Sequence, residues 1–208
     1  DEDCVKGAVA NYFAARLATQ HTGCVLTGEG SDEFLGGYHE VKAAKNMEEL
    51  QQMMAQLIDI AYNTGLQRLD RMMAAHSLEF RTPFLDRDVV AFCHQIPAQW
   101  KVYGTEQIEK WILRRAFSDR LPEDIVLRTK QPFGTGAGSS RLMGSITASR
   151  NSQEPLRGQR AGEEHPKLAS AEERYYYQIF KQSFPQPALG RLVARWDPMK
   201  ADFAFSQP

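Results

Sequence analysis

The stretch that most constrains this chain is a glycine-containing turn, T-G-E-G-S-D-E, at residues 27–33. The short apolar run 23–26 before it is typical of a buried strand, and Ser31 and Asp32 are residues that commonly begin a helix. The stretch therefore predicts a strand, a turn and a helix start. Gly28 in such a turn allows the backbone either to approach a ligand closely or to adopt a positive φ.

This turn combines the free N–H groups of a helix start with three acidic side chains, Glu29, Asp32 and Glu33. The N–H groups favour a phosphate, whereas three carboxylates repel it. A divalent cation between carboxylate and phosphate resolves the conflict, because Mg²⁺ takes one or two carboxylates together with phosphate oxygens. Glycine turns also occur in many α/β proteins that lack such a site, so the spacing alone leaves both interpretations open.

The surrounding pattern indicates an α/β chain in which helices predominate. Residues 3–20 carry apolar side chains at helical spacing, and together with the strand at 23–26 they form an α–β unit. Such a unit implies a parallel sheet, but few other convincing strands appear in the sequence. We therefore expect a portion of a longer protein. Further helices are predicted to follow five capping residues: Asn46, Thr64, Asp86, Thr105 and Ser170.

The charge and the hydropathy of the sequence argue against a nucleic-acid or membrane partner. The 208 residues carry a formal net charge of −1, which gives no field that would recruit nucleic acid or an acidic membrane. No stretch is long and apolar enough to span a bilayer. The three cysteines are scattered and suit packed thiols in a reducing cytosol. We expect a cytoplasmic protein with no nucleic-acid or membrane partner, and an incomplete sheet edge leaves a homodimer open.

The longer string T-G-E-G-S-D-E-F-L-G-G-Y at 27–38 closely resembles the S-G-E-G-S-D-E-x-x-G-G-Y motif of the asparagine synthetase family, in its ATP-dependent synthetase domain. Three later blocks match that family in the same order: R-T-P-F-L-D at 81–86, E-K-W-I-L-R at 109–114 and R-T-K-Q-P-F at 128–133. Four ordered blocks are far more specific than one. The chain is identified as a member of the glutamine-hydrolysing asparagine synthetase family, with the resemblance ending near Gly138.

The resemblance implies a partial ATP-pyrophosphatase-like (adenine nucleotide alpha hydrolase-like) parallel sheet with a helical C-terminal part. Residues 1–148 would be the C-terminal portion of the synthetase domain, 149–166 a polar linker or disordered loop, and 167–208 a C-terminal helix and tail. The family's S-G-G-x-D-S pyrophosphate loop and its glutaminase domain do not occur in this sequence. We therefore expect the isolated chain to be inactive.

The resemblance also implies an ATP-dependent amide-forming reaction. Mg²⁺·ATP would activate aspartate, or a related carboxylate, as an acyl-AMP with release of pyrophosphate. Ammonia from a glutaminase domain absent here would then displace AMP and give asparagine. Because the first step builds negative charge on phosphate oxygens, positioned cations would carry much of the catalysis.

Five residues would form the site by the same resemblance. Asp32 would hold Mg²⁺, and Thr27 and Gly28 would line the adenylate through their backbone. Lys130 would stabilise charge on the α-phosphoryl group and on the leaving pyrophosphate. Glu29 would take a proton from the incoming amine.

Other polar residues near these blocks have two interpretations. Lys110 and Arg114 stand four residues apart and either form a wall of the phosphate pocket or, for Lys110, pair with Glu106. Arg68 on a predicted helix is expected to lie on a solvated face. Glu33 is expected to support the helix start.

Two classes of function remain open at this stage. The first is an amide-forming ligase, and Gln131 and Pro132 leave its acceptor undecided, because they depart from the residues usual in asparagine synthetases and the same domain occurs in β-lactam synthetases and lasso-peptide cyclases. The second is a non-catalytic module that binds another protein or completes a split enzyme. The joint presence of Glu29, Asp32 and Lys130 favours the enzyme. A phosphate-binding regulatory domain rests on the glycine turn alone and ranks last.

Overall fold

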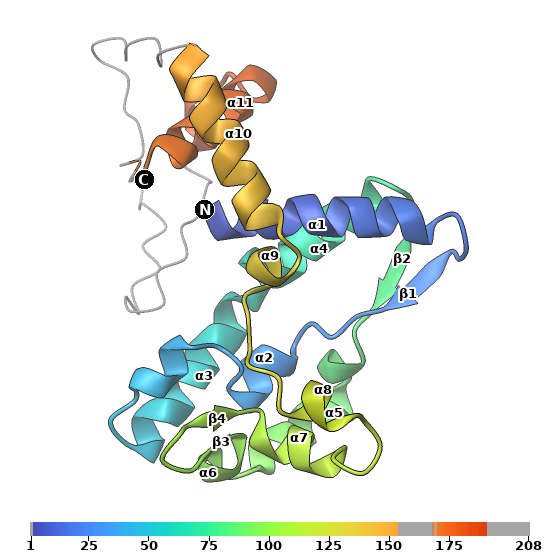
Figure 1. Cartoon of the computed structure of the whole chain (residues 1–208), viewed down its shortest axis with the longest axis vertical. Helices are drawn as coiled ribbons and strands as arrows, with labels where there is room; N and C mark the ends of the chain where they lie inside the picture. Colours follow the sequence, from blue (N-terminus) through green and yellow to red (C-terminus); the bar gives the residue numbers. More distant parts are fainter. Residues whose placement is uncertain (1, 154–167, 169, 191–208) are drawn as a thin grey trace. The chain divides into compact units, whose positions relative to one another are not determined.

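The computed structural model describes residues 2–153, 168 and 170–190 (Figure 1). Helices predominate in these residues, and the strands form one parallel and one antiparallel pair. This content is compatible with the predicted mainly helical α/β fragment, whereas the ATP-pyrophosphatase-like topology stays a prediction. The described residues group into two compact units, one of residues 11–131 and one that combines residues 2–10 with the described residues from 132 to 190.

The glycine turn 27–33 joins a parallel strand to a short helix, as the sequence predicts. Strand β1 pairs in parallel with β2, so that Leu26 lies opposite Arg81. The N–H of Thr27 donates to the carbonyl of Arg81 at 2.9 Å and carries the pairing one residue past β1. The bounds of these elements are Glu2–Ala18 for α1, Cys24–Leu26 for β1, Ser31–Leu35 for α2 and Glu79–Arg81 for β2.

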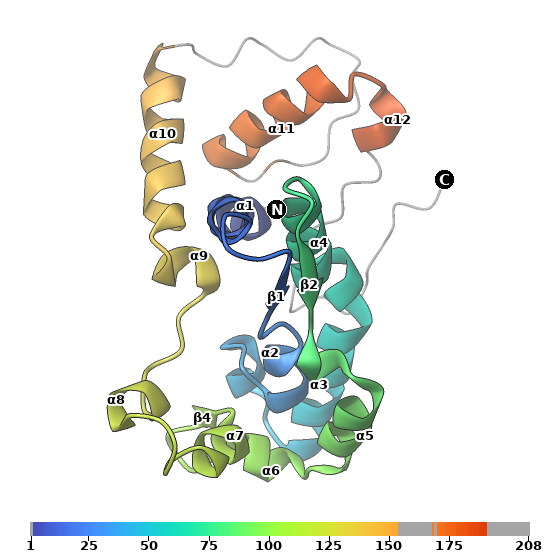
Figure 2. The same ribbon diagram turned by 90° about the vertical axis from the view of Figure 1, so that its right-hand side faces the viewer.

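Helices surround this centre in the unit of residues 11–131. Figure 2 shows α2 beside α3 and above α5, the two helices that it contacts together with α7. The helices are α3 (Met47–Ile60), α4 (Gly65–Ala74), α5 (Arg87–Gln95), α6 (Ala98–Lys101), α7 (Trp111–Ala116) and α8 (Glu123–Val126). Three 3-10 turns span Glu40–Ala43, Ala61–Asn63 and Pro83–Leu85, and strands β3 (Val102–Tyr103) and β4 (Ile108–Glu109) form the antiparallel pair.

Two apolar clusters hold these elements together. The first joins α1 and α4 to the start of β2 through Ala15, Leu69, Met73 and Leu78. The second joins α2 to α5 and packs against α7 through Phe34, Leu35, Cys93, Ile112 and Leu113. Because α2 contributes two buried apolar side chains to the second cluster, the start of this short helix is fixed in place by its own C-terminal half.

Local capping signals are largely confirmed. The Asn46 Oδ1 accepts from the N–H of Glu49, the Asp86 Oδ1 from the N–H of Asp88, and the Ser170 Oγ from the N–H of Glu173, all at 2.9 Å. Thr64 precedes α4 as predicted, but its hydroxyl donates back to the carbonyls of Ile60 and Ala61 instead of capping the helix.

The helix predicted to begin at Thr105 is wrong at its start. Residues 108–109 form strand β4, and α7 begins only at Trp111. The reason is a hairpin turn between β3 and β4, in which Gly104 has φ 74° and Gln107 has φ 49°. Two left-handed residues so close together interrupt any helix, and the apolar spacing that suggested one is shared between a strand and a later helix.

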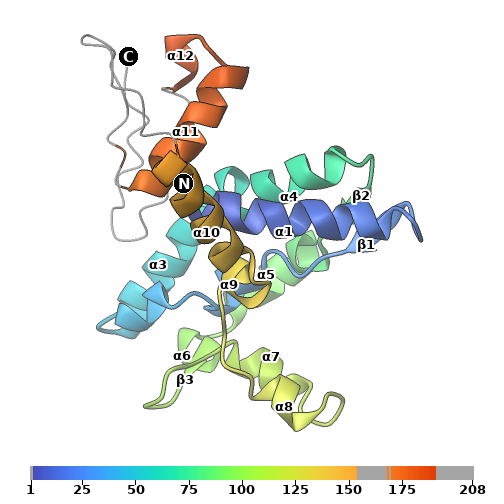
Figure 3. The ribbon, with the colours of Figure 1, turned by 45° about the horizontal axis from the view of Figure 1, so that its top comes forward.

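The described part of the second unit is helical. Helices α10 and α11 are in contact and overlap in the view of Figure 3. At the start of α1, the Lys6 Nζ lies 3.1 Å from a carboxylate oxygen of Glu2 and 3.5 Å from one of Glu172. The predicted linker 149–166 begins inside α10, and its part from residue 154 to the end lies outside the described residues. The helices are α9 (Phe133–Gly136), α10 (Ser139–Gln153), α11 (Ala171–Ser183) and α12 (Pro187–Gly190).

Among the described residues, no helix combines the length and the hydropathy that crossing a bilayer requires.

Candidate functional site

The site is built around the turn that follows β1. Its conformation depends on Gly30, which has φ 96° and stands immediately before α2. A side chain at this position would also collide with Leu85, because a Cβ would lie 2.7 Å from its Cδ2. Ser31 closes the turn on itself, since both its N–H and its hydroxyl donate to the Gly28 carbonyl. The turn is therefore rigid at the point where its acidic side chains emerge.

Asp32 lies between two lysines. Its Oδ1 is 2.7 Å from the Nζ of Lys110, and its Oδ2 accepts a hydrogen bond from the Nζ of Lys130 at 2.7 Å. Burial alone would raise the pKa of Asp32, but attraction and hydrogen bonding from the two ammonium groups outweigh it and lower this pKa. One carboxylate and two ammonium groups, each about one fifth exposed, thus form a centre with net positive charge.

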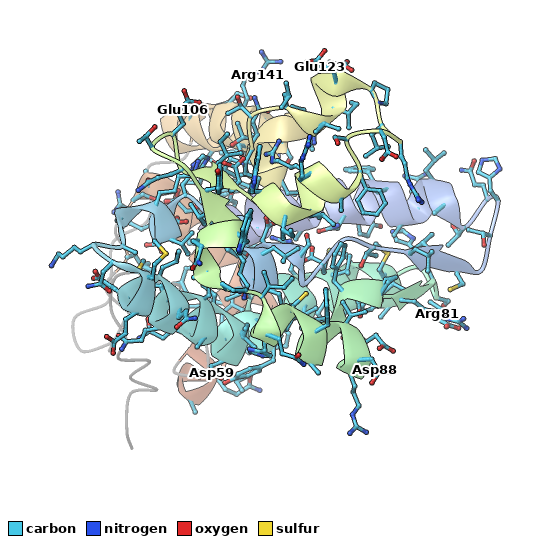
Figure 4. The ribbon with its side chains drawn as sticks, turned by 90° about the horizontal axis from the view of Figure 1, so that it is seen from below. Asp59, Arg81, Asp88, Glu106, Glu123 and Arg141 are labelled. Carbon is cyan, nitrogen blue, oxygen red and sulfur yellow. The ribbon has the colours of Figure 1, made fainter. Side chains whose placement is uncertain are left out.

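Lys110 reaches this centre because of its own backbone. It has φ 54°, precedes α7, and donates its N–H to the carbonyl of Leu35 at 3.2 Å. Its Nζ also donates to the Ser31 Oγ at 2.8 Å. The alternative partner Glu106 lies at the exposed outer end of the β3–β4 hairpin, where it is labelled in Figure 4. Of the two interpretations of Lys110, the pair with Glu106 is therefore wrong.

Glu29 has a different partner. Its Oε1 accepts a hydrogen bond from Arg68 at 3.1 Å, and both side chains are mostly buried. The prediction that Arg68 lies on a solvated face is wrong, because α4 turns this residue toward the acidic turn. Gly65 at the start of α4 makes the approach possible, since a Cβ there would lie 2.8 Å from the Glu29 Oε2.

Glu33 is separated from both pairs. It is 4% exposed, and its Oε1 accepts a hydrogen bond from the hydroxyl of Tyr38 at 2.7 Å. Burial raises the pKa of Glu33, and the nearby charges of Asp32 and Glu29 raise it further, against the lowering effect of the tyrosine. The side chain is thus buried against Tyr38, and its support of the helix start stays a prediction.

Thr27 and Gly28 border open space. A Cβ on Gly28 would meet no heavy atom within 4 Å. The Thr27 Oγ1 is buried, and no hydrogen-bond partner for it occurs among the described residues. An unpaired buried hydroxyl beside an uncovered backbone is the arrangement expected where a polar ligand completes the contacts.

A second charged network lies behind the lysines. Glu109 is 6% exposed, and its Oε2 accepts from Lys42 at 2.8 Å while its Oε1 accepts from Arg114 at 2.6 Å. Burial would raise the pKa of Glu109, but Lys42 and Arg114 outweigh it and lower this pKa. Arg114 also donates to two backbone carbonyls of the segment that leads to Lys130, those of Val126 and Arg128.

The fit of a metal depends on these charges. The described residues contain no group of three or more His, Cys, Asp or Glu side chains that would hold an ion by themselves. At Asp32 a free Mg²⁺ would have to displace a lysine and would be repelled by the other. A Mg²⁺ that arrives with phosphate oxygens brings excess negative charge, which the same lysines attract. The residues thus fit a nucleotide-bound Mg²⁺ and do not fit a free one.

The structure brings together Asp32 and Lys130 across 98 positions of sequence and places Glu29 on the same turn. The sequence does not predict two contacts of this site, that of Arg68 with Glu29 and that of Lys110 with Asp32. The short spacing of polar residues on the predicted α4 gave no signal, because a buried Arg and an exposed Arg look alike until the partner carboxylate is known.

Comparisons with known proteins identify relatives. A sequence model of the family described as asparagine synthase matches residues 2–63 and 42–191. The chain is 36% identical over 170 residues to a glutamine-hydrolysing asparagine synthetase of Sandersonia aurantiaca, an alignment that covers 78% of this chain and 32% of that protein. It is 32% identical over 196 residues to asparagine synthetase B of Escherichia coli K12, covering 93% of this chain and 35% of that protein. The chain therefore spans about a third of the length of the relatives it matches.

The close approach at Gly37 gives a test of the lysine centre. A Cβ on Gly37 would lie 1.8 Å from the Asp32 Oδ1 and 2.4 Å from the Lys110 Cε, so Gly37→Ala must push the pair apart. We expect urea denaturation to show a loss of about 1–3 kcal/mol, as overpacking usually costs. Gly23→Ala is the matched control, because its Cβ would meet nothing within 4 Å. Equal stability of the two variants would contradict the described geometry.

The buried Glu33 predicts a pH effect. Because its pKa is raised above the ordinary value of 4.5, ionisation opposes folding, and stability is lost as the pH rises through the folded-state pKa. Glu33→Gln removes that ionisation and keeps an oxygen to accept from Tyr38. We expect the free energy of unfolding of the variant to gain on that of the wild type as the pH rises from about 4 to about 8.

Urea denaturation across this pH range measures the effect, and Glu48→Gln, at an exposed position of α3, controls for the loss of one acidic group. The assignment of Glu33 fails if its variant shows the same pH profile as the control.

Proposed function

Because this chain belongs to the asparagine synthase family, we propose that it provides part of the site where an asparagine synthetase transfers AMP from Mg²⁺·ATP to a carboxylate substrate. The observation that carries this proposal is the Asp32 carboxylate held between Lys110 and Lys130 beside an open glycine turn. The arrangement has net positive charge, and the nucleotide is the anion that it suits. We propose asparagine as the product, because the relatives are named asparagine synthetases, and aspartate as the carboxylate substrate that the resemblance implies.

In the first step a carboxylate oxygen of the substrate attacks the α-phosphorus of ATP. A new P–O bond forms, the bond to the bridging oxygen breaks, and pyrophosphate leaves with the negative charge. The ammonium groups of Lys110 and Lys130 exchange the Asp32 carboxylate for phosphate oxygens and stabilise this charge where it develops. Asp32, released from one or both lysines, would hold the Mg²⁺ that accompanies the nucleotide, and the ion would neutralise part of the phosphate charge.

In the second step ammonia attacks the acyl carbon of the aspartyl-AMP. The nitrogen must lose a proton as the C–N bond forms, and AMP leaves with the bonding electrons. Glu29 accepts that proton. Arg68 holds its Oε1, and its Oε2 lies against Gly65, whose missing side chain permits this close approach. The ammonia derives from glutamine hydrolysed in another domain.

Thr27 and Gly28 line the adenylate. The uncovered Gly28 backbone and the unpaired hydroxyl of Thr27 offer polar contacts without a side chain in the way. Their position directly after β1 places them on the same rigid turn as Asp32 and Glu29.

The assay for the first step is aspartate-dependent exchange of pyrophosphate into ATP, with the complete protein that carries these residues. We expect Lys130→Ala to lower the exchange rate by about 100- to 1,000-fold, the usual effect of losing one group that stabilises transition-state charge. Lys45→Ala, at an exposed position, is the matched control and keeps the wild-type rate.

The Lys130→Ala protein should stay folded and unfold in one cooperative transition, because Asp32 keeps its ion pair with Lys110. Full exchange activity in this variant contradicts the role of Lys130. A wild-type protein that exchanges pyrophosphate with none of aspartate, glutamate or other carboxylates contradicts the proposed reaction.

The two lysines also predict how the metal binds. In calorimetric titrations, Mg²⁺ alone should give no binding heat attributable to Asp32, whereas Mg²⁺ with a non-hydrolysable ATP analogue should bind. Asp32→Asn should weaken binding of the analogue only when Mg²⁺ is present. The amide keeps the shape of the carboxylate but lacks the negative charge that would hold the ion. Tight binding of Mg²⁺ without nucleotide, lost in Asp32→Asn, would show that the lysines do not guard the carboxylate.

A further inference from the structure

We propose that Arg114 is a positioning residue that fixes the two phosphate-binding lysines relative to each other. It touches neither Asp32 nor the open turn in the described structure. Its guanidinium instead joins the two chain segments on which Lys110 and Lys130 stand. The inference rests on the proposed function of these lysines and adds a residue that acts through them.

The first connection is to Glu109, the residue immediately before Lys110. The Nε of Arg114 donates to the Glu109 carbonyl at 2.8 Å, and one terminal nitrogen donates to its Oε1 at 2.6 Å. Both the backbone and the side chain of Glu109 are thus held. Lys110 has a left-handed backbone conformation, so the direction of its side chain depends on the peptide group between Glu109 and Lys110.

The second connection is to the segment that ends at Lys130. The other terminal nitrogen of Arg114 donates to the carbonyls of Val126 and Arg128, the latter at 3.0 Å and two residues before Lys130. On the far side of Lys130, its own carbonyl lies 3.3 Å from the His39 Nε2. The segment 127–131 has no regular secondary structure, so these contacts from outside fix its path.

The chemistry of arginine suits this task. A guanidinium offers five N–H donors in a rigid plane, and here its three nitrogens serve four acceptors on two segments. The side chain is 15% exposed, so water competes little for these bonds. A lysine has one nitrogen and cannot reach acceptors on both segments at once. The spacing of the two ammonium groups at Asp32 is therefore set by one planar group behind them.

The kinetic test is a double-mutant cycle in pyrophosphate exchange. We expect Arg114→Ala to lower kcat by about 10- to 100-fold, since a misplacement near 1 Å costs about that much, with a smaller change in KM for Mg²⁺·ATP. Arg114→Lys should not restore kcat. In a Lys130→Ala background, Arg114→Ala should cost clearly less than it costs in the wild type, because one of the two side chains through which it acts is already gone. A full additional loss in that background overturns the proposal.

Lys42→Met separates positioning from stability. It breaks the other ion pair of Glu109, at 2.8 Å, without touching the segment 126–130. We expect it to lower the free energy of unfolding as Arg114→Ala does, while kcat stays within twofold of the wild type. A loss of kcat equal to that of Arg114→Ala would reduce Arg114 to a general stabiliser of the Glu109 network and so overturn the proposal.

Limited trypsin digestion tests the clamp without relying on the proposed reaction. Trypsin cleaves after Arg128 and Lys130, and release of the Arg128 carbonyl should speed cleavage at these two sites several-fold in Arg114→Ala but not in Lys42→Met. Unchanged cleavage contradicts the clamp itself. Faster cleavage with unchanged kcat contradicts the positioning role and leaves the proposed function intact. A wild-type protein without exchange activity contradicts the proposed function but does not affect the contacts of Arg114 with the two segments.

Discussion

The ion pairs of Asp32 with Lys110 and Lys130 are the interactions on which the rest of the site depends. A carboxylate that is four fifths buried is costly unless charge compensates it, and neither lysine is near it in sequence. The chain must therefore bring the β3–β4 hairpin and the segment after α8 to the start of α2. Two lysines exceed what one carboxylate needs for neutrality, and the net positive charge would attract an anion.

The second constraint is the room that glycines leave around α2. Gly30 packs against Leu85 and Phe84 on one side, Gly36 against Val102, and Gly37 against the Asp32–Lys110 pair. Each approach is closer than a Cβ allows. Each of the three glycines thus permits a close approach by a different neighbour, although the sequence alone suggests one flexible stretch. Their shared effect is that a five-residue helix can be enclosed by charged groups and apolar residues alike.

The sequence predicts the features that depend on neighbouring residues better than those that depend on residues far apart in the chain. The caps at Asn46, Asp86 and Ser170 depend on residues two or three positions away, and these were predicted correctly. The prediction of a helix from Thr105 is wrong because the turn before β4 depends on the positive φ angles of Gly104 and Gln107, which apolar spacing does not indicate. The ATP-pyrophosphatase-like topology needs strands beyond the two that pair here, so it stays a prediction.

The site residues follow the same rule. Family resemblance singled out Asp32 and Lys130, and the structure places them in contact, although their roles are still proposals. Arg68 is 39 positions from Glu29, and no local pattern distinguishes it from an exposed helical arginine. The partner of Lys110 was open for the same reason, since the nearby Glu106 was as plausible as a distant carboxylate. Long-range charge pairing is thus the part of this fold that single-sequence reasoning could not reach.

The three acids of the turn show why such pairing matters for chemistry. Asp32 is kept ionised by two lysines, Glu29 is held by one arginine, and Glu33 is buried against Tyr38 where burial favours its neutral form. Identical carboxyl groups within five residues thus have three electrostatic environments. A reaction with separate phosphoryl-transfer and proton-transfer steps needs such a division, because a carboxylate that binds a metal with phosphate cannot also be the group that accepts the amine proton. The partners supplied by α4, α7 and the segment before α9 set these environments, and the turn by itself does not.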